Sequence, residues 1–194
     1  MRRPTVALSA LAIFVAGCGG GDSKTADEWA AEACPAMTSW YAGWDEHLGS
    51  GWLPVAAEWD VLVPAGDLDG GRDLVLSYYA DLGRLADDAV ETLMEIGIPD
   101  VDGGAEVMDE IVRYLEGLKA SLSAPTTLLS EAPDEDLADL GADELMEGLA
   151  MMWGFALGED VARNLPISVP PELSDAVDGP GCEFLAWLFG ASAP

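Results

Sequence analysis

Residues 73–99 read DLVLSYYADLGRLADDAVETLMEIGIP and contain the strongest structural pattern in the chain. Apolar side chains recur there at intervals of three and four, which places them along one side of an α-helix. They are Val75, Tyr78, Leu82, Leu85, Ala89, Leu93 and Ile96. Gly97 can supply a left-handed helix cap, and Pro99 cannot continue a helix. We therefore predict a long amphipathic helix from about Asp73 to Ile96.

Two more amphipathic helices are predicted on either side of this one. Thr25 and Glu28 form a capping box, so a first helix should begin there and end at Gly49. A third helix should start near Gly104 and close at Pro125. Their apolar stripes are Trp29, Ala33, Met37, Trp40, Trp44 and Leu48 in the first, and Met108, Ile111, Leu115, Leu118 and Leu122 in the third.

A fourth helix should begin after Pro133 or near Asp143 and end before Pro166. Its stripe is Leu145, Leu149, Met152 and Ala156. Short helical pieces should follow at 172–177 and 181–189, and no segment alternates as a strand does. Short connections favour antiparallel neighbours, so the sequence predicts an all-α, up-and-down bundle of four main helices.

Residues 52–71 lack a sustained helical period and contain several prolines and glycines, so we expect a long crossing segment there. This segment is unusually apolar. It either covers one end of the bundle or meets a partner, because so many apolar side chains are costly to leave in water. Trp52 and Trp59 are the candidate contacts if a partner binds.

The N-terminus has the features of a bacterial export signal. Arg2 and Arg3 precede an apolar run of about eleven residues, which is too short to span a bilayer. The sequence Val15-Ala16-Gly17-Cys18 resembles the lipobox of bacterial lipoproteins. The resemblance implies that residues 1–17 are a signal peptide and that Cys18 is the first mature residue. An ordinary secreted protein with an incidental cysteine is the alternative.

By the same resemblance, Cys18 carries a thioether-linked diacylglycerol, and the protein is held on the extracytoplasmic face of the cell membrane. The mature chain is long enough for one domain with a substantial core and too short for two comfortable ones. We assign residues 18–25 to a flexible tether and residues 26–194 to a single acidic helical domain.

With Cys18 assigned to lipid, Cys34 and Cys182 remain. Two thiols left in an oxidising compartment usually pair, so we predict a disulfide that ties the short C-terminal helix back to the first helix. Two buried free thiols are the alternative.

Several motifs of the domain resemble small helical lipoproteins and secreted proteins of actinobacteria. They are the segment from Trp29 to Trp44 around Cys34, the turn from Gly97 to Gly104 that opens a helix, and the terminal Gly181-Cys182-Glu183-Phe184-Leu185. The resemblance covers most of the mature chain. It implies a helical fold but no particular activity, so it transfers no functional residue.

The chain is strongly acidic, with 36 Asp and Glu, eight Lys and Arg, and a formal net charge of -28. Such a surface repels phosphate backbones, which excludes nucleic acid as a partner. The acids are spread through every segment, which favours a solvated surface over a calcium site. The candidate for a weak cation site is Asp100, Asp102 and Glu106, in the turn before the third helix.

No catalytic constellation is visible, and we assign neither a catalytic residue nor a cofactor. His47 is the single histidine, and no serine has the glycine-flanked pattern of a hydrolase nucleophile. We therefore predict a non-enzymatic lipoprotein that binds or organises an envelope protein or divalent cations. The alternatives are an envelope hydrolase that uses carboxylates and a weak divalent-cation-binding accessory protein.

Salt should stabilise this domain. Added ions screen the repulsion between like charges, so the melting temperature is expected to rise between low and molar NaCl. Thermal unfolding followed by circular dichroism at increasing NaCl measures the effect. A melting temperature that does not change with salt would contradict it.

Overall fold

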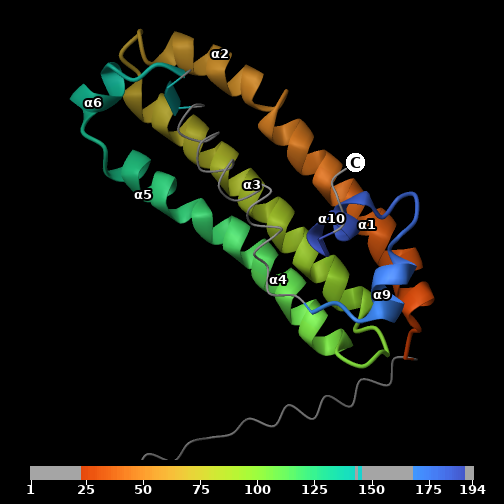
Figure 1. The fold of residues 1–194 in the computed structure, drawn as a ribbon. Coiled ribbons are helices and arrows are strands. Elements are labelled where there is room, and N and C mark those ends of the chain that lie inside the picture. The colour runs from red at the N-terminus through yellow and green to blue at the C-terminus, as the bar shows by residue number, and fades with distance from the viewer. Residues whose placement is uncertain (1–22, 143, 146–167, 191–194) are drawn as a thin grey trace, which may run out of the picture.

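A computed structural model shows an all-α fold, as predicted (Figure 1). It describes residues 23–142, 144–145 and 168–190. The long helices are α1 (Ala26–Leu48), α3 (Leu68–Ile96) and α4 (Gly104–Ser121). The shorter ones are α2 (Trp52–Leu62), α5 (Ser123–Glu131), α6 (Asp134–Ala138), α9 (Pro171–Ala176) and α10 (Glu183–Leu188).

Helix α3 lies between α1 on one side and α4 and α5 on the other (Figure 1). It also contacts α2 and α6. Its predicted stripe faces these neighbours, with Val75, Leu82 and Leu93 fully buried. The helix begins earlier than predicted because the Asp67 side chain accepts a hydrogen bond from the Gly70 backbone at 3.0 Å. It ends at Gly97 as predicted, where φ is 88°.

The capping box of α1 is confirmed. The Glu28 backbone N–H donates to Thr25 Oγ1 at 3.3 Å, and the Thr25 backbone N–H donates to Glu28 Oε2 at 2.9 Å. This second bond, with the one from the Thr25 hydroxyl, lowers the pKa of the Glu28 carboxyl because both stabilise the carboxylate. Residue Gly49 caps the other end of the helix.

The prediction of a crossing segment over residues 52–71 is wrong. Helix α2 covers Trp52–Leu62, and α3 already begins at Leu68. Pro54 is the third residue of α2, where a missing N–H removes no bond within the helix. Gly71 lies inside α3 and faces the end of α2. A Cβ at this position would come within 2.8 Å of the Val63 side chain. The glycine therefore allows a close packing of the two helices rather than a turn.

The predicted end of the third helix at Pro125 is also wrong. Helix α4 ends at Ser121, and α5 begins at Ser123 with Pro125 as its third residue. The same tolerance of proline in a first helical turn explains the difference. Of the fourth predicted helix, Leu145 is described, whereas Leu149, Met152 and Ala156 lie outside the described residues.

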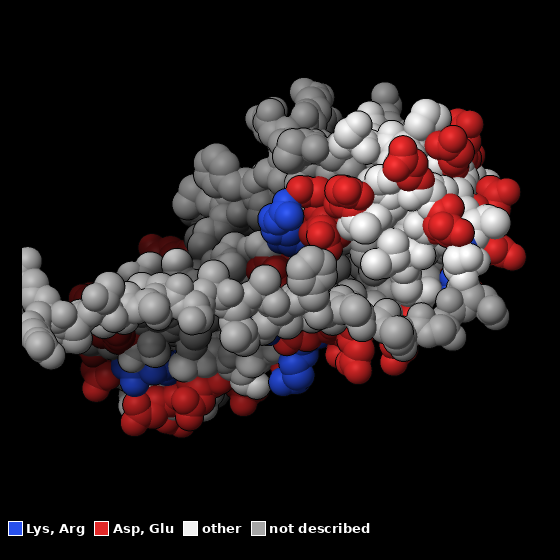
Figure 2. All heavy atoms as spheres, turned by 90° about the horizontal axis from the view of Figure 1, so that it is seen from below, with Lys and Arg blue, Asp and Glu red and all other residues white. Residues whose placement is uncertain are grey.

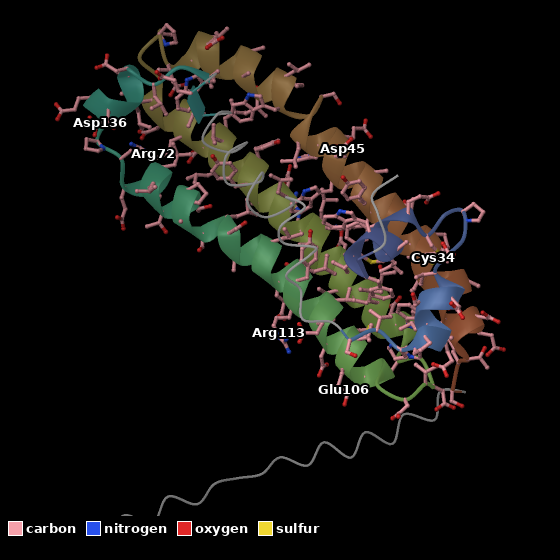
Figure 3. All side chains as sticks on the ribbon, in the orientation of Figure 1. Cys34, Asp45, Arg72, Glu106, Arg113 and Asp136 are labelled. Atoms are coloured by element: carbon pink, nitrogen blue, oxygen red, sulfur yellow. A yellow bond between two sulfur atoms is a disulfide. The ribbon has the colours of Figure 1, made fainter. Side chains whose placement is uncertain are left out.

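The predicted disulfide between Cys34 and Cys182 is present, at a sequence separation of 148 and with 4.5 Å between their Cα atoms. It joins α1 to the start of α10 (Figure 3). Thr38 Oγ1 donates to the Gly181 carbonyl oxygen at 2.8 Å beside it. The C-terminal pieces α9 and α10 lie where the sequence predicts them, and both pack on α1.

One arginine fastens α3 to the corner between α5 and α6. Arg72 donates to the carbonyl oxygens of Leu129 and Ala132 at 3.3 and 3.0 Å. It also pairs with Asp69 and Asp134 at 2.9 and 3.1 Å, and its side chain is only 17% exposed. A single planar guanidinium thus links three helices through its fork of donors.

Replacing Arg72 should weaken the whole domain. Because Arg72→Ala leaves two carbonyl oxygens and a largely buried corner without donors, the unfolding free energy is expected to fall by about 2–3 kcal/mol. Arg72→Lys should recover only part of that loss, since an ammonium lacks the planar fork. Urea unfolding followed by circular dichroism gives both values.

Arg84 provides the matched control. Among the described residues it pairs only with Asp81, three residues before it on α3, and its side chain is exposed. Arg84→Ala should therefore cost at most about 0.5 kcal/mol. An equal loss for Arg72→Ala and Arg84→Ala would show that Arg72 does not hold the corner.

Candidate functional site

The domain begins at Lys24, close to the predicted lipid site. Cys18 itself lies outside the described residues. Lys24 Nζ donates to Glu32 Oε2 at 2.7 Å and to the Ile96 carbonyl oxygen at 2.9 Å. Its own carbonyl oxygen accepts from the Asp100 N–H at 2.7 Å, within an isolated parallel bridge between Lys24 and Pro99. Lys24 and Thr25, the last two residues of the predicted tether, are thus hydrogen-bonded to the helical domain.

The loop between α3 and α4 receives a further bond from the core of α1. Trp29 Nε1 donates to the Gly97 carbonyl oxygen at 2.8 Å, and the Trp29 side chain is completely buried. The start of α1 and the end of α3 are thus fixed against each other at one end of the bundle (Figure 1). Over the described residues, no helix has the length and apolarity needed to cross a membrane.

The cation candidate at Asp100, Asp102 and Glu106 is not supported. In the parts of the chain that the structure describes, no three His, Cys, Asp or Glu side chains are grouped as metal ligands. Asp100 instead contributes its backbone N–H to the bridge with Lys24. Glu106 lies in the first turn of α4, where a negative side chain interacts favourably with the helix dipole.

The candidate partner contacts Trp52 and Trp59 belong to the core. Their side chains are 3% and 1% exposed, so the structure corrects the idea that a partner touches them. Trp59 Nε1 donates to the Leu140 carbonyl oxygen at 3.0 Å, and the Trp52 ring lies edge-on to Tyr78. The other face of α2 remains in solvent, where Leu53 is 66% and Val61 67% exposed. We call Leu53 and Val61 the α2 outer face.

The His47 side chain packs against an aromatic side chain of α3. Its ring stacks on Tyr78 at 4.8 Å between ring centroids, and the Tyr78 hydroxyl donates to the His47 carbonyl oxygen at 2.9 Å. Burial raises the pKa of Tyr78 to about 12, so its hydroxyl stays protonated as the donor. The buried His47 Nε2 atom has no hydrogen-bond partner among the described residues.

Three of the described carboxylates belong to different helices of the fold, α1, α4 and α6. Figure 3 places Asp45, Glu106 and Asp136 on three separate parts of the molecule. Glu183 shows the same direction of pKa shift as Glu28, since a backbone hydrogen bond from Gly181 lowers it. A general acid for glycoside cleavage requires the opposite shift.

An apolar cavity of about 330 Å³ lies between α3, α5 and α6, and sequence patterns did not reveal it. Its main lining residues are Tyr79, Leu128, Leu129, Leu137, Leu140 and Leu145. They come from separate segments, and only the packing of those segments brings them together. The volume is at the lower end of the range for small-molecule sites, and the lining offers apolar contact rather than chemistry.

The surface around these features is acidic. On the face shown in Figure 2, Asp and Glu are spread over the described surface, and Lys and Arg are few. All five described basic side chains form ion pairs with carboxylates: Lys24, Arg72, Arg84, Arg113 and Lys119. No other Lys or Arg among the described residues is therefore left to neutralise the remaining carboxylates.

No protein-family model matches the chain, and neither curated proteins nor solved structures gave a significant match.

Proposed function

We propose that this protein is a lipoprotein held on the extracytoplasmic face of a bacterial cell membrane through Cys18, where its acidic helical domain binds or organises an envelope partner without catalysing a reaction. The main support is the Cys34–Cys182 bridge, which uses both cysteines of the domain. Structural disulfides are typical of compartments outside the cytoplasm. The bridge therefore agrees with an export signal and leaves Cys18 alone for lipid.

The binding role is supported by the α2 outer face. Leu53 and Val61 are large apolar side chains exposed on a helix whose opposite side is packed into the core. We take these two exposed side chains as the candidate contact site for a partner. Among the described carboxyl groups, hydrogen bonds lower the pKa of Glu28 and of Glu183, which is opposite to the shift that a general acid needs.

Replacing Cys18 should release the protein from the membrane. In Cys18→Ala the thioether cannot form, so the protein is expected in the soluble fraction after cell fractionation and immunoblotting. Its melting temperature should equal that of the parent, because Cys18 lies before Lys24, the first described residue with side-chain bonds to the domain. Ser23→Ala keeps the lipobox and serves as the control that stays in the membrane. Membrane retention of Cys18→Ala would refute lipid anchoring.

A photo-cross-linking amino acid on the α2 outer face should capture the partner. Placed at Leu53 or at Val61 in intact cells, it is expected to give the same adduct by mass spectrometry from both positions. The same group at Ala120, exposed on α4, is the control and should give none. Identical adducts from Ala120, or none from α2, would contradict a partner site there.

A further inference from the structure

We propose that the end of the bundle formed by Met94, Ile98 and the adjoining Lys24 rests on the lipid headgroups, so that the domain stands on the membrane with α2 and α6 farthest from it. This inference depends on the proposed lipid anchor at Cys18. It adds a second, non-covalent membrane contact and gives the domain a defined orientation.

The first argument is the reach of the chain. Lys24 is held to Glu32, Ile96 and Asp100 by the bonds described above. Six residue steps separate it from Cys18, and such a segment spans at most about 21 Å when fully extended. Helix α3 has 29 residues and is therefore about 43 Å long. The end of α3 that contacts Lys24 must stay close to the bilayer, whereas its other end need not.

The second argument is the exposed apolar surface at that same end. Met94 is 65% exposed in the last turn of α3, and Ile98 is 56% exposed in the loop that follows. Both side chains are exposed to solvent, although their neighbours Leu93 and Pro99 are buried. The bonds from Lys24 to Ile96 and from Trp29 to Gly97 hold this short segment rigidly beside the start of the tether. Apolar side chains held at a membrane surface partition into the headgroup region.

Charge bears on the choice of lipid for a test. Acidic side chains are spread over the described surface, and an anionic headgroup repels them. The end-on contact also brings exposed acidic side chains to the headgroups, among them Glu95, Asp100 and Asp102. Zwitterionic phosphatidylcholine is therefore the appropriate lipid for a first test, because it adds no net repulsion.

Hydroxyl-radical footprinting read by mass spectrometry tests the orientation. The full lipidated protein in phosphatidylcholine vesicles is compared with Cys18→Ala mixed with the same vesicles. Oxidation of Met94 and Ile98 is expected to be several-fold slower in the lipidated protein. Leu53 and Leu128, exposed on α2 and α5, should react equally in both samples. Equal reactivity of Met94 in both samples, or slower oxidation of Leu53 and Leu128, would overturn the proposal.

A matched pair of variants tests the apolar contact itself. Ile98→Asp should remain in the vesicle fraction through its acyl chains but restore fast oxidation of Met94. Leu53→Asp changes a residue on α2 that is 66% exposed, against 56% for Ile98, and should leave Met94 protected. If Ile98→Asp leaves Met94 as protected as in the parent, the contact does not depend on this segment and the proposal is wrong.

Failure of the anchor and failure of the orientation give different results. If Cys18 carries no lipid, the parent protein does not float with the vesicles and its intact mass lacks the diacylglycerol. If it floats while Met94 oxidises as fast as in Cys18→Ala, the anchor stands and only the orientation is refuted.

Discussion

Burial of one apolar stripe on α3 organises the rest of the domain. Helices α1, α2, α4, α5 and α6 all contact α3, and its side chains Val75, Leu82 and Leu93 are fully enclosed among them. Polar bonds then hold the two ends of the same helix. Arg72 fastens its beginning to the α5–α6 corner, and the Trp29 and Lys24 bonds fasten its end. The apolar contacts bring the helices together, and these few directional bonds set where each one lies along α3.

The packed core of this domain stabilises the folded state, whereas the charge on its surface destabilises it. Its net charge favours expansion because like charges repel, and the five described basic side chains are too few to offset the acids. The interior is built from closely packed aromatic rings, such as Trp40 against Trp44 and Phe184, at 5.4 and 5.3 Å between centroids. A disulfide beside this aromatic group limits how far the chain can expand in the unfolded state.

Sequence patterns predicted what depends on local spacing. The stripe of α3, the Thr25 capping box and the pairing of Cys34 with Cys182 were all predictable, because each follows from residue intervals or from the number of cysteines. Helix α2 was missed since it is apolar on both sides and has no period to detect. Three features arise only when distant segments meet, so no local sequence pattern predicts them. They are the burial of Trp52 and Trp59, the Arg72 bonds and the apolar cavity.

The bridge between Cys34 and Cys182 also determines whether cleavage by a protease separates the two fragments. It closes most of the domain into a covalent ring, with both junctions near the ends of the chain. A single cut anywhere inside that ring opens it without separating the fragments, because each fragment keeps one of the bridged cysteines. Both pieces would stay joined to the N-terminal segment of the chain. Separation of the two fragments therefore requires a second cut inside the ring or reduction of the bridge.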